Sequence, residues 1–246
     1  MKIYRSISEL PAVTGPVVAI IGNFDGVHLG HQGVVAEVIE RAHFLGGTSL
    51  VITFDPHPTR ILRPDSPTPL ITPTPRKLEL LAATGVDATL VLPFTDTLRH
   101  MHPREFATEI LVGALHITEI HEGDNFRFGY HAEAGVNGLE DLGRELGFRT
   151  VVYAPRIVRG GPVSSSRIRS LIAAGEVILV AGRRVDHGNS VVRTVRLVNG
   201  PCVRIIRNPQ RGGSDRSCGR ELRAAGGIHS VAFGCVQDPN PVRVHA

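Results

Sequence analysis

Two histidines and three glycines share one ten-residue segment, Gly22–His31, with the sequence GNFDGVHLGH. His28 and His31 stand three residues apart, so they share one face of a helix that begins here. Each imidazole can donate a hydrogen bond to a phosphate oxygen as negative charge develops there. The glycines let the backbone approach a ligand closely, and a helix N-terminus attracts anions. Together with Asn23, the segment therefore predicts a phosphate-binding site.

The same segment also has simpler interpretations. The histidines could be polar residues that cap the helix. An H-x-x-H spacing could bind zinc, although the sequence offers no third ligand nearby. The glycine positions match neither a Walker A loop nor the G-x-G-x-x-G dinucleotide fingerprint, so neither of those sites is expected.

A second group of phosphate-binding residue types is VSSSRIR, from Val163 to Arg169. Three hydroxyls at the start of a helix make a good cap, which is the simpler interpretation. Three hydroxyls with two arginines are more than a cap requires. Ser164–Ser166 and Arg167 can hold a triphosphate through hydroxyl, backbone and guanidinium contacts, whereas Arg169 could face solvent instead.

Two further segments suit a flat heterocyclic ring. The TFDPHP segment, Thr53–Pro58, has an aromatic residue and two prolines that stiffen the loop, although such a segment alone is more often only a turn. The GDNFRFG segment, residues 123–129, contains Asn125, whose amide can donate and accept at once. We expect Phe126 and Phe128 to point to opposite sides of this segment, with one in the core while the other could stack on a ring.

Alternating strands and helices are expected to position these segments. Continuous apolar runs predict strands at Val17–Ile21, Leu50–Phe54, Thr89–Phe94, Ile117–His121 and Thr150–Ala154. Apolar residues at helical spacing predict helices at His31–Phe44, Lys77–Ala83, Pro103–Leu115, Leu139–Leu146 and Ser164–Ala174, the last stopped by Gly175. This alternation indicates an α/β fold with a doubly wound parallel sheet, in which ligands bind at the carboxyl ends of the strands.

Composition limits the class of protein. The chain has 246 residues, of which 42% are hydrophobic, so it can form a sizeable core and is not disordered throughout. No apolar run approaches the roughly 18–20 residues of a membrane span, and the N-terminus lacks the apolar core of a signal peptide. The three cysteines cannot all pair and none lies in a CxxC motif, so we expect a cytoplasmic protein without a disulfide framework or zinc ribbon.

Charge is distributed unevenly along the chain. Residues 1–176 carry 16 Lys+Arg and 19 Asp+Glu, a net charge of −3, whereas residues 177–246 carry 11 Arg and 4 acids, a net charge of +7. We therefore predict a boundary near Glu176, a first domain of residues 1–183 and a basic, poorly patterned tail of residues 184–246. The tail arginines could bind nucleic acid, but stacking aromatic residues are nearly absent, so we favour a poorly ordered appendage.

In this order, GNFDGVHLGH, TFDPHP, GDNFRFG and VSSSRIR resemble the bacterial bifunctional riboflavin kinase/FAD synthetase family. The match is to its N-terminal FMN adenylyltransferase module, a nucleotidyltransferase with an H-x-G-H signature, and covers residues 1 to about 176. The resemblance implies a Rossmann-like fold that transfers AMP from ATP to FMN, giving FAD and pyrophosphate with Mg²⁺. It also implies small-molecule partners and neither membrane nor nucleic-acid binding, and it leaves the oligomeric state open.

The resemblance implies roles for the motif residues as well. Asn23, His28 and His31 are the implied catalytic residues, which bind and stabilise the ATP phosphates. The other implied ATP- and phosphate-binding residues are Gly22, Phe24, Asp25, Gly26, Gly30, Ser164, Ser165, Ser166 and Arg167. The implied flavin-binding residues are Phe54, Asp55, Pro56, Pro58, Asn125, Phe126, Arg127 and Phe128. No side chain is expected to ligate a metal, and Ser166, where the family often has Thr, keeps the hydroxyl.

The resemblance weakens after Glu176. The family continues into a β-barrel riboflavin kinase module with a Pro-Thr-x-Asn motif, and no Pro-Thr-x-Asn occurs in residues 177–246. We therefore expect FMN adenylyltransferase activity without riboflavin kinase activity, and a tail of out-of-frame or otherwise replaced sequence. Three rival hypotheses remain. They are the same fold acting on another substrate, such as phosphopantetheine or choline phosphate; a non-catalytic flavin- or nucleotide-binding remnant of a bifunctional enzyme; and riboflavin kinase activity, by family name only.

Overall fold

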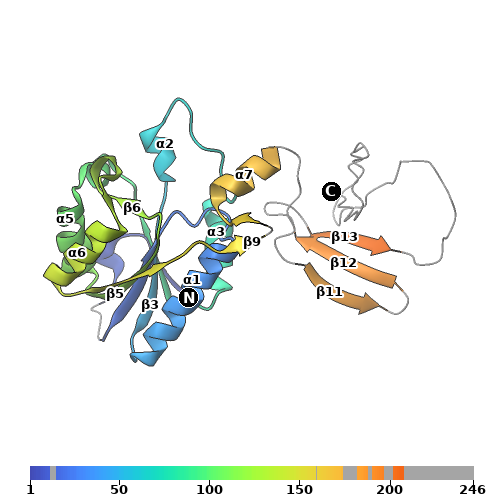
Figure 1. Ribbon diagram of the computed structural model, residues 1–246, viewed down its shortest axis with the longest axis horizontal. Coiled ribbons are helices and arrows are strands. Elements are labelled where there is room, and N and C mark those ends of the chain that lie inside the picture. Colours follow the sequence, from blue (N-terminus) through green and yellow to red (C-terminus); the bar gives the residue numbers. More distant parts are fainter. Residues whose placement is uncertain (12–14, 159, 174–181, 188–189, 197–201, 208–246) are drawn as a thin grey trace. The chain divides into compact units, whose positions relative to one another are not determined.

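The computed structural model describes two compact units of the chain (Figure 1), Met1–Arg167 and Ile168–Ala246. The residues that it describes are 1–11, 15–158, 160–173, 182–187, 190–196 and 202–207. None of the helices in these ranges is both long enough and apolar enough to cross a membrane.

The first unit is built on a six-stranded sheet in which all neighbouring strands run parallel. The strand order is β1-β4-β3-β2-β5-β8. The strands are β1 (Lys2–Tyr4), β2 (Val17–Ile21), β3 (Thr48–Phe54), β4 (Ala88–Leu92), β5 (Ile117–Gly123) and β8 (Arg149–Tyr153). All five predicted strands and the parallel α/β architecture are confirmed. The edge strand β1 was missed because three residues are too short to show a pattern.

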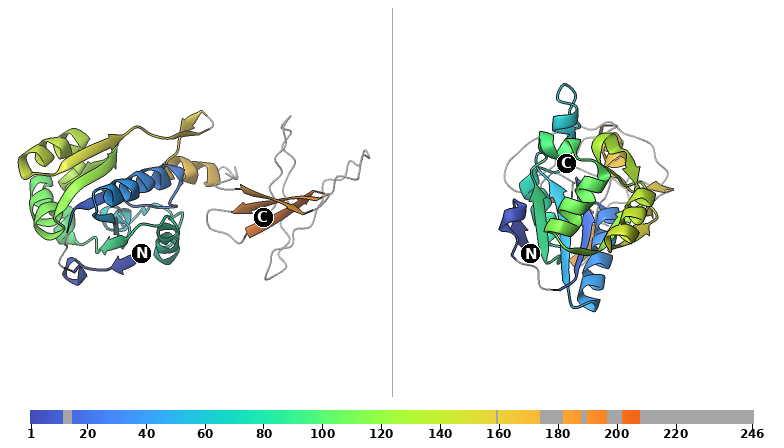
Figure 2. Two further views of the ribbon diagram at one scale, coloured as in Figure 1. Left: turned by 90° about the horizontal axis from the view of Figure 1, so that it is seen from below. Right: turned by 90° about the vertical axis from the view of Figure 1, so that its left-hand side faces the viewer.

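Helices cover both faces of this sheet, as a doubly wound fold requires (Figure 2). The main helices are α1 (Leu29–Phe44), α3 (Thr74–Ala82), α5 (Pro103–Glu105), the π-helix η2 (Phe106–Ala114) and α6 (Val136–Leu146). A further helix, α7 (Ser165–Ala173), begins at the end of the first unit and continues into the second. Buried Val35, Val38 and Leu81 of α1 and α3 pack on one face of the sheet. Buried Leu111 of η2 and Leu139 of α6 pack on the other face. The predicted helix over 103–115 is therefore present, but most of it has π-helical rather than α-helical hydrogen bonds.

Short elements occupy the connections of the first unit. They are η1 (Ile7–Glu9), α2 (Pro58–Leu62), α4 (Asp96–His100), η3 (Tyr130–Ala132), and the hairpins β6 (Arg127–Phe128) with β7 (Ala134–Gly135) and β9 (Ile157–Val158) with β10 (Gly161–Pro162). Sequence reasoning missed them because elements of two to five residues are shorter than the windows in which hydrophobic periodicity is visible.

Strands β2 and β5 separate near their carboxyl ends. Their pairing ends at Ala19 with Ile120, although β2 continues to Ile21. The backbone N–H of Ile21 donates instead to Oε1 of buried Glu122, at 2.7 Å. Burial raises the pKa of Glu122 well above its ordinary value and so favours its neutral form. In the sheet, β3 lies on one side of β2 and β5 lies on the other, so the direction in which strands are added reverses here. The gap between β2 and β5 is therefore the topological switch point where such sheets bind ligands.

In the second unit, three described strands form an antiparallel sheet in the order β11-β12-β13. The strands are β11 (Gly182–His187), β12 (Ser190–Arg196) and β13 (Cys202–Arg207). β12 and β13 coincide with short Val/Ile runs of the sequence. Three expectations stay predictions: the helix stop at Gly175, the domain boundary after residue 183 and the character of the remaining tail. Gly175 and residues 208–246 lie outside the described residues.

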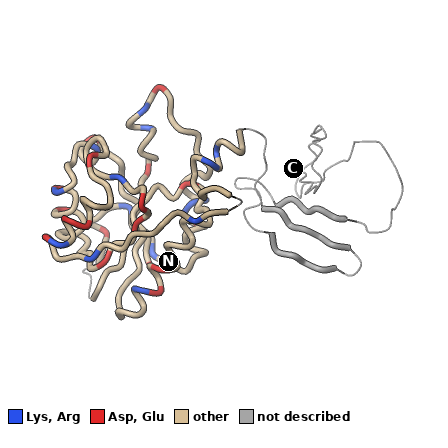
Figure 3. Tube along the Cα trace, in the orientation of Figure 1, with Lys and Arg blue, Asp and Glu red and all other residues tan. Residues whose placement is uncertain are grey.

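Basic and acidic residues are interspersed along the trace of the first unit (Figure 3). The nucleic-acid interpretation rested instead on the arginines of residues 177–246, whose side chains lie outside the described part of the structure.

Candidate active site

The predicted phosphate segment lies where β2 ends and α1 begins. His28 is the N-cap of α1, and its Nδ1 accepts a hydrogen bond from the backbone N–H of His31 at 3.3 Å. The capping interpretation is therefore correct for His28, but it uses only one of its two ring nitrogens. Because Nδ1 accepts, the proton of the neutral ring is on Nε2, which can donate to a ligand.

The two imidazoles form a stacked pair at the start of α1. Their ring centroids are 3.6 Å apart with an interplanar angle of 15°, and the ring of Phe24 lies 5.0 Å from that of His31. Burial lowers the pKa of His28 to about 4. Burial, with the nearby His28 and Lys77, lowers the pKa of His31 well below its ordinary value. Both rings are therefore neutral at pH 7 and act as hydrogen-bonding groups rather than as cations.

One atom of this pair is left unsatisfied. Nδ1 of His31 is enclosed and has no hydrogen-bond partner among the residues that the structure describes. Proteins rarely leave a buried polar atom unpaired, because its desolvation is then uncompensated. An unpaired nitrogen beside a helix N-terminus is a feature of a site that is completed by a ligand.

The backbone conformation of residues 22–31 depends on glycines and on residues with positive φ. A Cβ at Gly30 would lie 3.2 Å from Nδ1 of His28, so a side chain there would displace the capping ring. Gly26 has a φ of +85°, which favours glycine. Phe24 and Val27 also have positive φ values of 48° and 40°, although both are almost fully buried. Such strain costs about 1–3 kcal/mol per residue and is concentrated at functional sites.

Asp25 fixes the outer side of this loop. Its buried carboxylate accepts hydrogen bonds from the backbone N–H groups of Ile71 and Thr72 at 2.9–3.0 Å. The Thr72 hydroxyl in turn accepts from the N–H of Gly26 at 2.9 Å. The structure thus gives the Asp25 carboxylate a structural role, and its predicted phosphate contact stays a prediction.

The start of α7 lies against the same loop, as the two phosphate motifs require. The Ser165 hydroxyl donates to the backbone carbonyl of Asp25 at 2.9 Å. The carbonyl of Val163 lies 3.4 Å from the position that a Cβ would take at Gly30. Segments more than a hundred residues apart in sequence therefore meet at the N-terminus of α1.

Ser164, Ser166 and Arg167 are placed differently from one another. The Ser164 hydroxyl accepts from the backbone N–H of Arg167 at 3.2 Å, so it caps α7. Ser166 is exposed. The Arg167 guanidinium donates from Nη1 to the carbonyls of Val158 and Pro162, in the preceding β9–β10 hairpin, at 3.0 and 3.3 Å. A guanidinium has five N–H donors, so these two bonds use only part of its capacity.

The predicted flavin segment after β3 is partly exposed. Phe54 ends β3 and packs edge-on against Phe94, with ring centroids 5.6 Å apart. Asp55 and Pro56 are exposed, and Pro58 opens α2. The half-buried Phe54 ring and the prolines thus form a stiff apolar edge beside the carboxyl end of β3.

The predicted flavin segment after β5 forms a turn and the short strand β6. Asn125 is exposed, and Arg127 donates twice to the carbonyl of Ala132 at 2.7 and 3.0 Å. Phe126 and Phe128 stack on each other, with centroids 5.5 Å apart and an angle of 18°. The expectation that they point to opposite sides is wrong, because side chains two residues apart in an extended chain lie on the same face. Both pack against the core.

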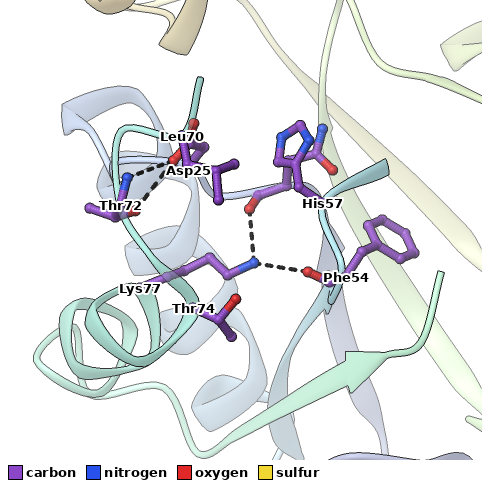
Figure 4. Close-up of a pocket in the computed structure, with 8 residues that line it drawn as sticks. Asp25, Phe54, His57, Leu70, Thr72, Thr74 and Lys77 are labelled. Atoms are coloured by element: carbon purple, nitrogen blue, oxygen red, sulfur yellow. Dashed lines mark hydrogen bonds between the residues drawn. The ribbon is translucent and has the colours of Figure 1, made fainter. Parts of the chain in front are cut away.

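Sequence reasoning missed Lys77, a buried residue of α3 at this edge of the sheet (Figure 4). It lines a small pocket together with Asn23, Asp25, Phe54, His57, Leu70, Thr72 and Thr74. Its Nζ donates to the carbonyls of Asn23 and Phe54. The available signal was that Lys77 occurs four residues before Leu81, at the spacing of the apolar stripe of the predicted helix.

Comparison with known proteins identifies the family. A family model described as FAD synthetase matches residues 10–167, nearly two thirds of the chain. The chain belongs to the FAD synthetase family. It is 29% identical over 216 residues to the bifunctional riboflavin kinase/FMN adenylyltransferase of Buchnera aphidicola subsp. Acyrthosiphon pisum, covering 84% of this chain and 68% of that protein. It is 34% identical over 203 residues to the protein of the same name from Pseudomonas fluorescens, covering 78% and 65%.

This FAD synthetase family member spans about two thirds of the length of the curated relatives that it matches. Residues 1–176 are about 72% of the chain, so the similarity to the Buchnera protein continues beyond them. Among solved structures, a macrolide-efflux protein from Streptococcus pneumoniae aligns with a TM-score of 0.65 and 19% identity, covering 83% of this chain and 77% of that chain. That likeness shows a shared fold alone.

Proposed function

We propose that the chain is an FMN adenylyltransferase, which transfers AMP from ATP to FMN and releases FAD and pyrophosphate. Its membership of the FAD synthetase family supports the reaction. The observation that carries the proposal is the pair of neutral, stacked histidines at the N-terminus of α1, with the hydroxyl-rich start of α7 beside it. An N-terminus with two imidazoles and several hydroxyls suits a triphosphate.

The chemistry requires alignment more than activation. The FMN phosphate is already an anionic nucleophile at neutral pH, so the reaction needs no strong general base. An FMN phosphate oxygen attacks the α-phosphorus of ATP, and the bond to the bridging oxygen of pyrophosphate breaks in line with it. The rate then depends on holding two anions together and on stabilising the charge that develops on the α-phosphate and the leaving group.

The histidines would stabilise that charge by donation. His28 can donate from Nε2 while its Nδ1 holds the helix cap. His31 has a ring nitrogen that the described residues leave unpaired. A bound triphosphate would also raise the pKa of both imidazoles toward their ordinary values, because a nearby negative charge favours the cation. We propose that Ser164–Ser166 and Arg167 bind the phosphates from the opposite side, with Asn23 at the start of the loop after β2.

The flavin is proposed to bind along the carboxyl ends of β3 and β5. Phe54, Pro56 and Pro58 provide a rigid apolar edge after β3. After β5, Asn125 is exposed and so is available to a heterocycle edge, and half-buried Phe128 packs against the core. These two edges flank the phosphate loop in the sheet order, because β2 lies between β3 and β5.

We propose that Mg²⁺ enters with ATP. Among the described residues no three His, Cys, Asp or Glu side chains cluster closely enough to hold a metal ion. This suits an ion that keeps several waters and is held chiefly by phosphate oxygens, as Mg²⁺ commonly is. When bound, Mg²⁺ would neutralise part of the phosphate charge. The expected cytoplasmic location and the absence of riboflavin kinase activity also stay predictions.

Product analysis tests the proposal and separates its rivals. Purified protein is incubated with ATP, Mg²⁺ and FMN, the products are separated by chromatography, and FMN binding is followed by flavin fluorescence. We expect FAD and pyrophosphate in equal amounts. Quenching of FMN fluorescence without FAD would contradict the proposal and favour a non-catalytic remnant. If neither quenching nor FAD is observed, the result would favour another phosphate-bearing substrate.

A further inference from the structure

We propose that Lys77 is a positioning residue, which sets the spacing between the phosphate-binding loop after β2 and the flavin-binding loop after β3. This role rests on the proposed function. Lys77 is 4% exposed and lies on α3, outside every motif that the sequence analysis used. Figure 4 shows its side chain extending between the two loops, with hydrogen bonds to both.

All three protons of the Lys77 ammonium are used inside the protein. Nζ donates to Oγ1 of Thr53 at 2.9 Å, to the carbonyl of Phe54 at 3.1 Å and to the carbonyl of Asn23 at 3.3 Å. An ammonium group has three donors, so none remains for a substrate. The geometry therefore excludes a role as a direct phosphate ligand and leaves the protein's own loops as its partners.

A further hydrogen bond, donated by Thr53, closes this arrangement. The Thr53 hydroxyl, which accepts from Lys77, donates to the same carbonyl of Asn23 at 3.3 Å. Thr53 belongs to β3 and is fully buried, so it is a rigid reference point. Asn23, Thr53 and Lys77 thus form a closed triangle that ties the first residues of one substrate loop to the start of the other.

Stability alone does not account for a lysine here. Its three partners are neutral oxygens, and a buried cation without an ion pair costs free energy that an apolar side chain of the same length would not. Burial lowers the pKa of Lys77, while nearby Asp55 and Asp25 oppose that shift. The ammonium is also one of the charges that lower the pKa of His31, so it helps to keep that ring neutral.

The consequence of this tie is geometric. In the proposed reaction one loop holds the ATP phosphates and the other holds the flavin. A displacement of about 1 Å between reacting groups can cost roughly 10²-fold in rate. Each loop would keep its own substrate contacts without Lys77, but their relative placement would be less well defined.

The test compares two substitutions on one helix. Lys77→Met keeps a long unbranched side chain and removes the three donors. Leu81→Ala is the matched control, because Leu81 is fully buried on the same helix, belongs to an apolar core cluster and makes none of the hydrogen bonds that join the two loops. We expect Lys77→Met to lower kcat for FAD formation by roughly 10–10²-fold, while the Kd values for ATP alone and FMN alone change less than about threefold. Leu81→Ala should lower the melting temperature with little change in kcat per folded molecule.

Amide hydrogen exchange gives a readout that is independent of activity. In ligand-free Lys77→Met, amides of residues 22–28 and 53–58 should exchange faster. In Leu81→Ala, amides of residues 53–58 should change much less, because none of these residues belongs to the core cluster of Leu81. Thr53→Val removes one acceptor of the same triangle and should show the same split between kcat and Kd. This variant keeps the test valid if Lys77→Met does not fold.

Several outcomes would overturn the inference. The first is a wild-type kcat in folded Lys77→Met. The second is a loss of kcat no larger than the unfolded fraction of that variant explains. The third is unchanged amide hydrogen exchange in both loops of Lys77→Met. A tenfold rise in the Kd for ATP or FMN with unchanged kcat would show instead that Lys77 binds that substrate directly. Absence of FAD from the wild-type protein would refute the proposed function, and hydrogen exchange would still decide whether Lys77 ties the loops.

Discussion

His28 has two roles that substitution can separate. Its Nδ1 caps α1 by accepting from the His31 N–H, and its Nε2 is the proposed donor to phosphate. Asparagine is a good N-cap but is too short to place a donor where Nε2 lies. His28→Asn therefore removes the donor and keeps the cap, whereas His28→Ala removes both.

The expected magnitudes differ accordingly. Loss of one transition-state donor typically lowers kcat by roughly 10²–10³-fold, so both variants should lose that much FAD formation. Loss of the cap costs about 1 kcal/mol more in His28→Ala. That cost corresponds to a melting temperature about 2–4 °C lower than that of His28→Asn. Steady-state FAD formation and thermal melts measure the two effects independently.

The pH dependence of stability gives a second measurement. Burial lowers the pKa of His28 to about 4 in the folded protein, from 6.5. Below pH 6.5 the unfolded chain binds a proton at this site that the folded chain does not bind. The free energy of unfolding therefore falls as the pH drops toward 4, by about 3 kcal/mol from this residue. Urea titrations between pH 7 and 4 should show a correspondingly smaller fall in His28→Asn.

Two results would refute this reasoning. A wild-type kcat in His28→Asn would show that Nε2 does not act on the phosphates. An unchanged pH dependence of the unfolding free energy in the same variant would show that His28 is not held neutral by burial.

Three further predictions follow from the same site. His31→Ala should lower FAD formation by roughly 10²–10³-fold with the far-ultraviolet circular dichroism unchanged, and a wild-type rate would contradict its role. Removal of residues 184–246 should leave a protein that unfolds cooperatively and binds ATP; calorimetry showing no cooperative transition would contradict independence of the tail. With riboflavin and ATP alone, chromatography should show no FMN, since kinase chemistry attacks the γ-phosphate and needs a different alignment; FMN accumulation would reveal a kinase site.

Much of the sheet was predictable because its strands are buried on both faces. Such strands read as continuous apolar runs, and β2 has the predicted bounds Val17–Ile21. The π-helical hydrogen bonds of η2 were not predictable, because apolar spacing shows that a segment is helical without showing its hydrogen-bond pattern. The strands β11 to β13 were not assigned as a sheet, since register between short runs depends on pairing that one sequence does not show.

The site was predictable to the extent that its motifs follow strands. GNFDGVHLGH directly follows β2 of the parallel sheet. VSSSRIR follows the β9–β10 hairpin after β8, and it meets GNFDGVHLGH although more than a hundred residues separate them. The contacts of buried polar residues were not predictable. The Asp25 carboxylate binds amides 46 and 47 residues away, and Glu122 fills the gap left by a lost strand pair. Lys77 resembles any surface lysine until the packing of α3 is known.

The most direct test of the central claim is to follow the α-phosphate of ATP. The purified full chain is incubated with FMN, Mg²⁺ and ATP labelled at the α-phosphorus, and in parallel with ATP labelled at the γ-phosphorus. The account predicts that the α-label appears in FAD and the γ-label in pyrophosphate, with both transfers reduced together in His28→Asn. An α-label that remains in ATP, or that is released as AMP while FMN stays unmodified, would contradict it.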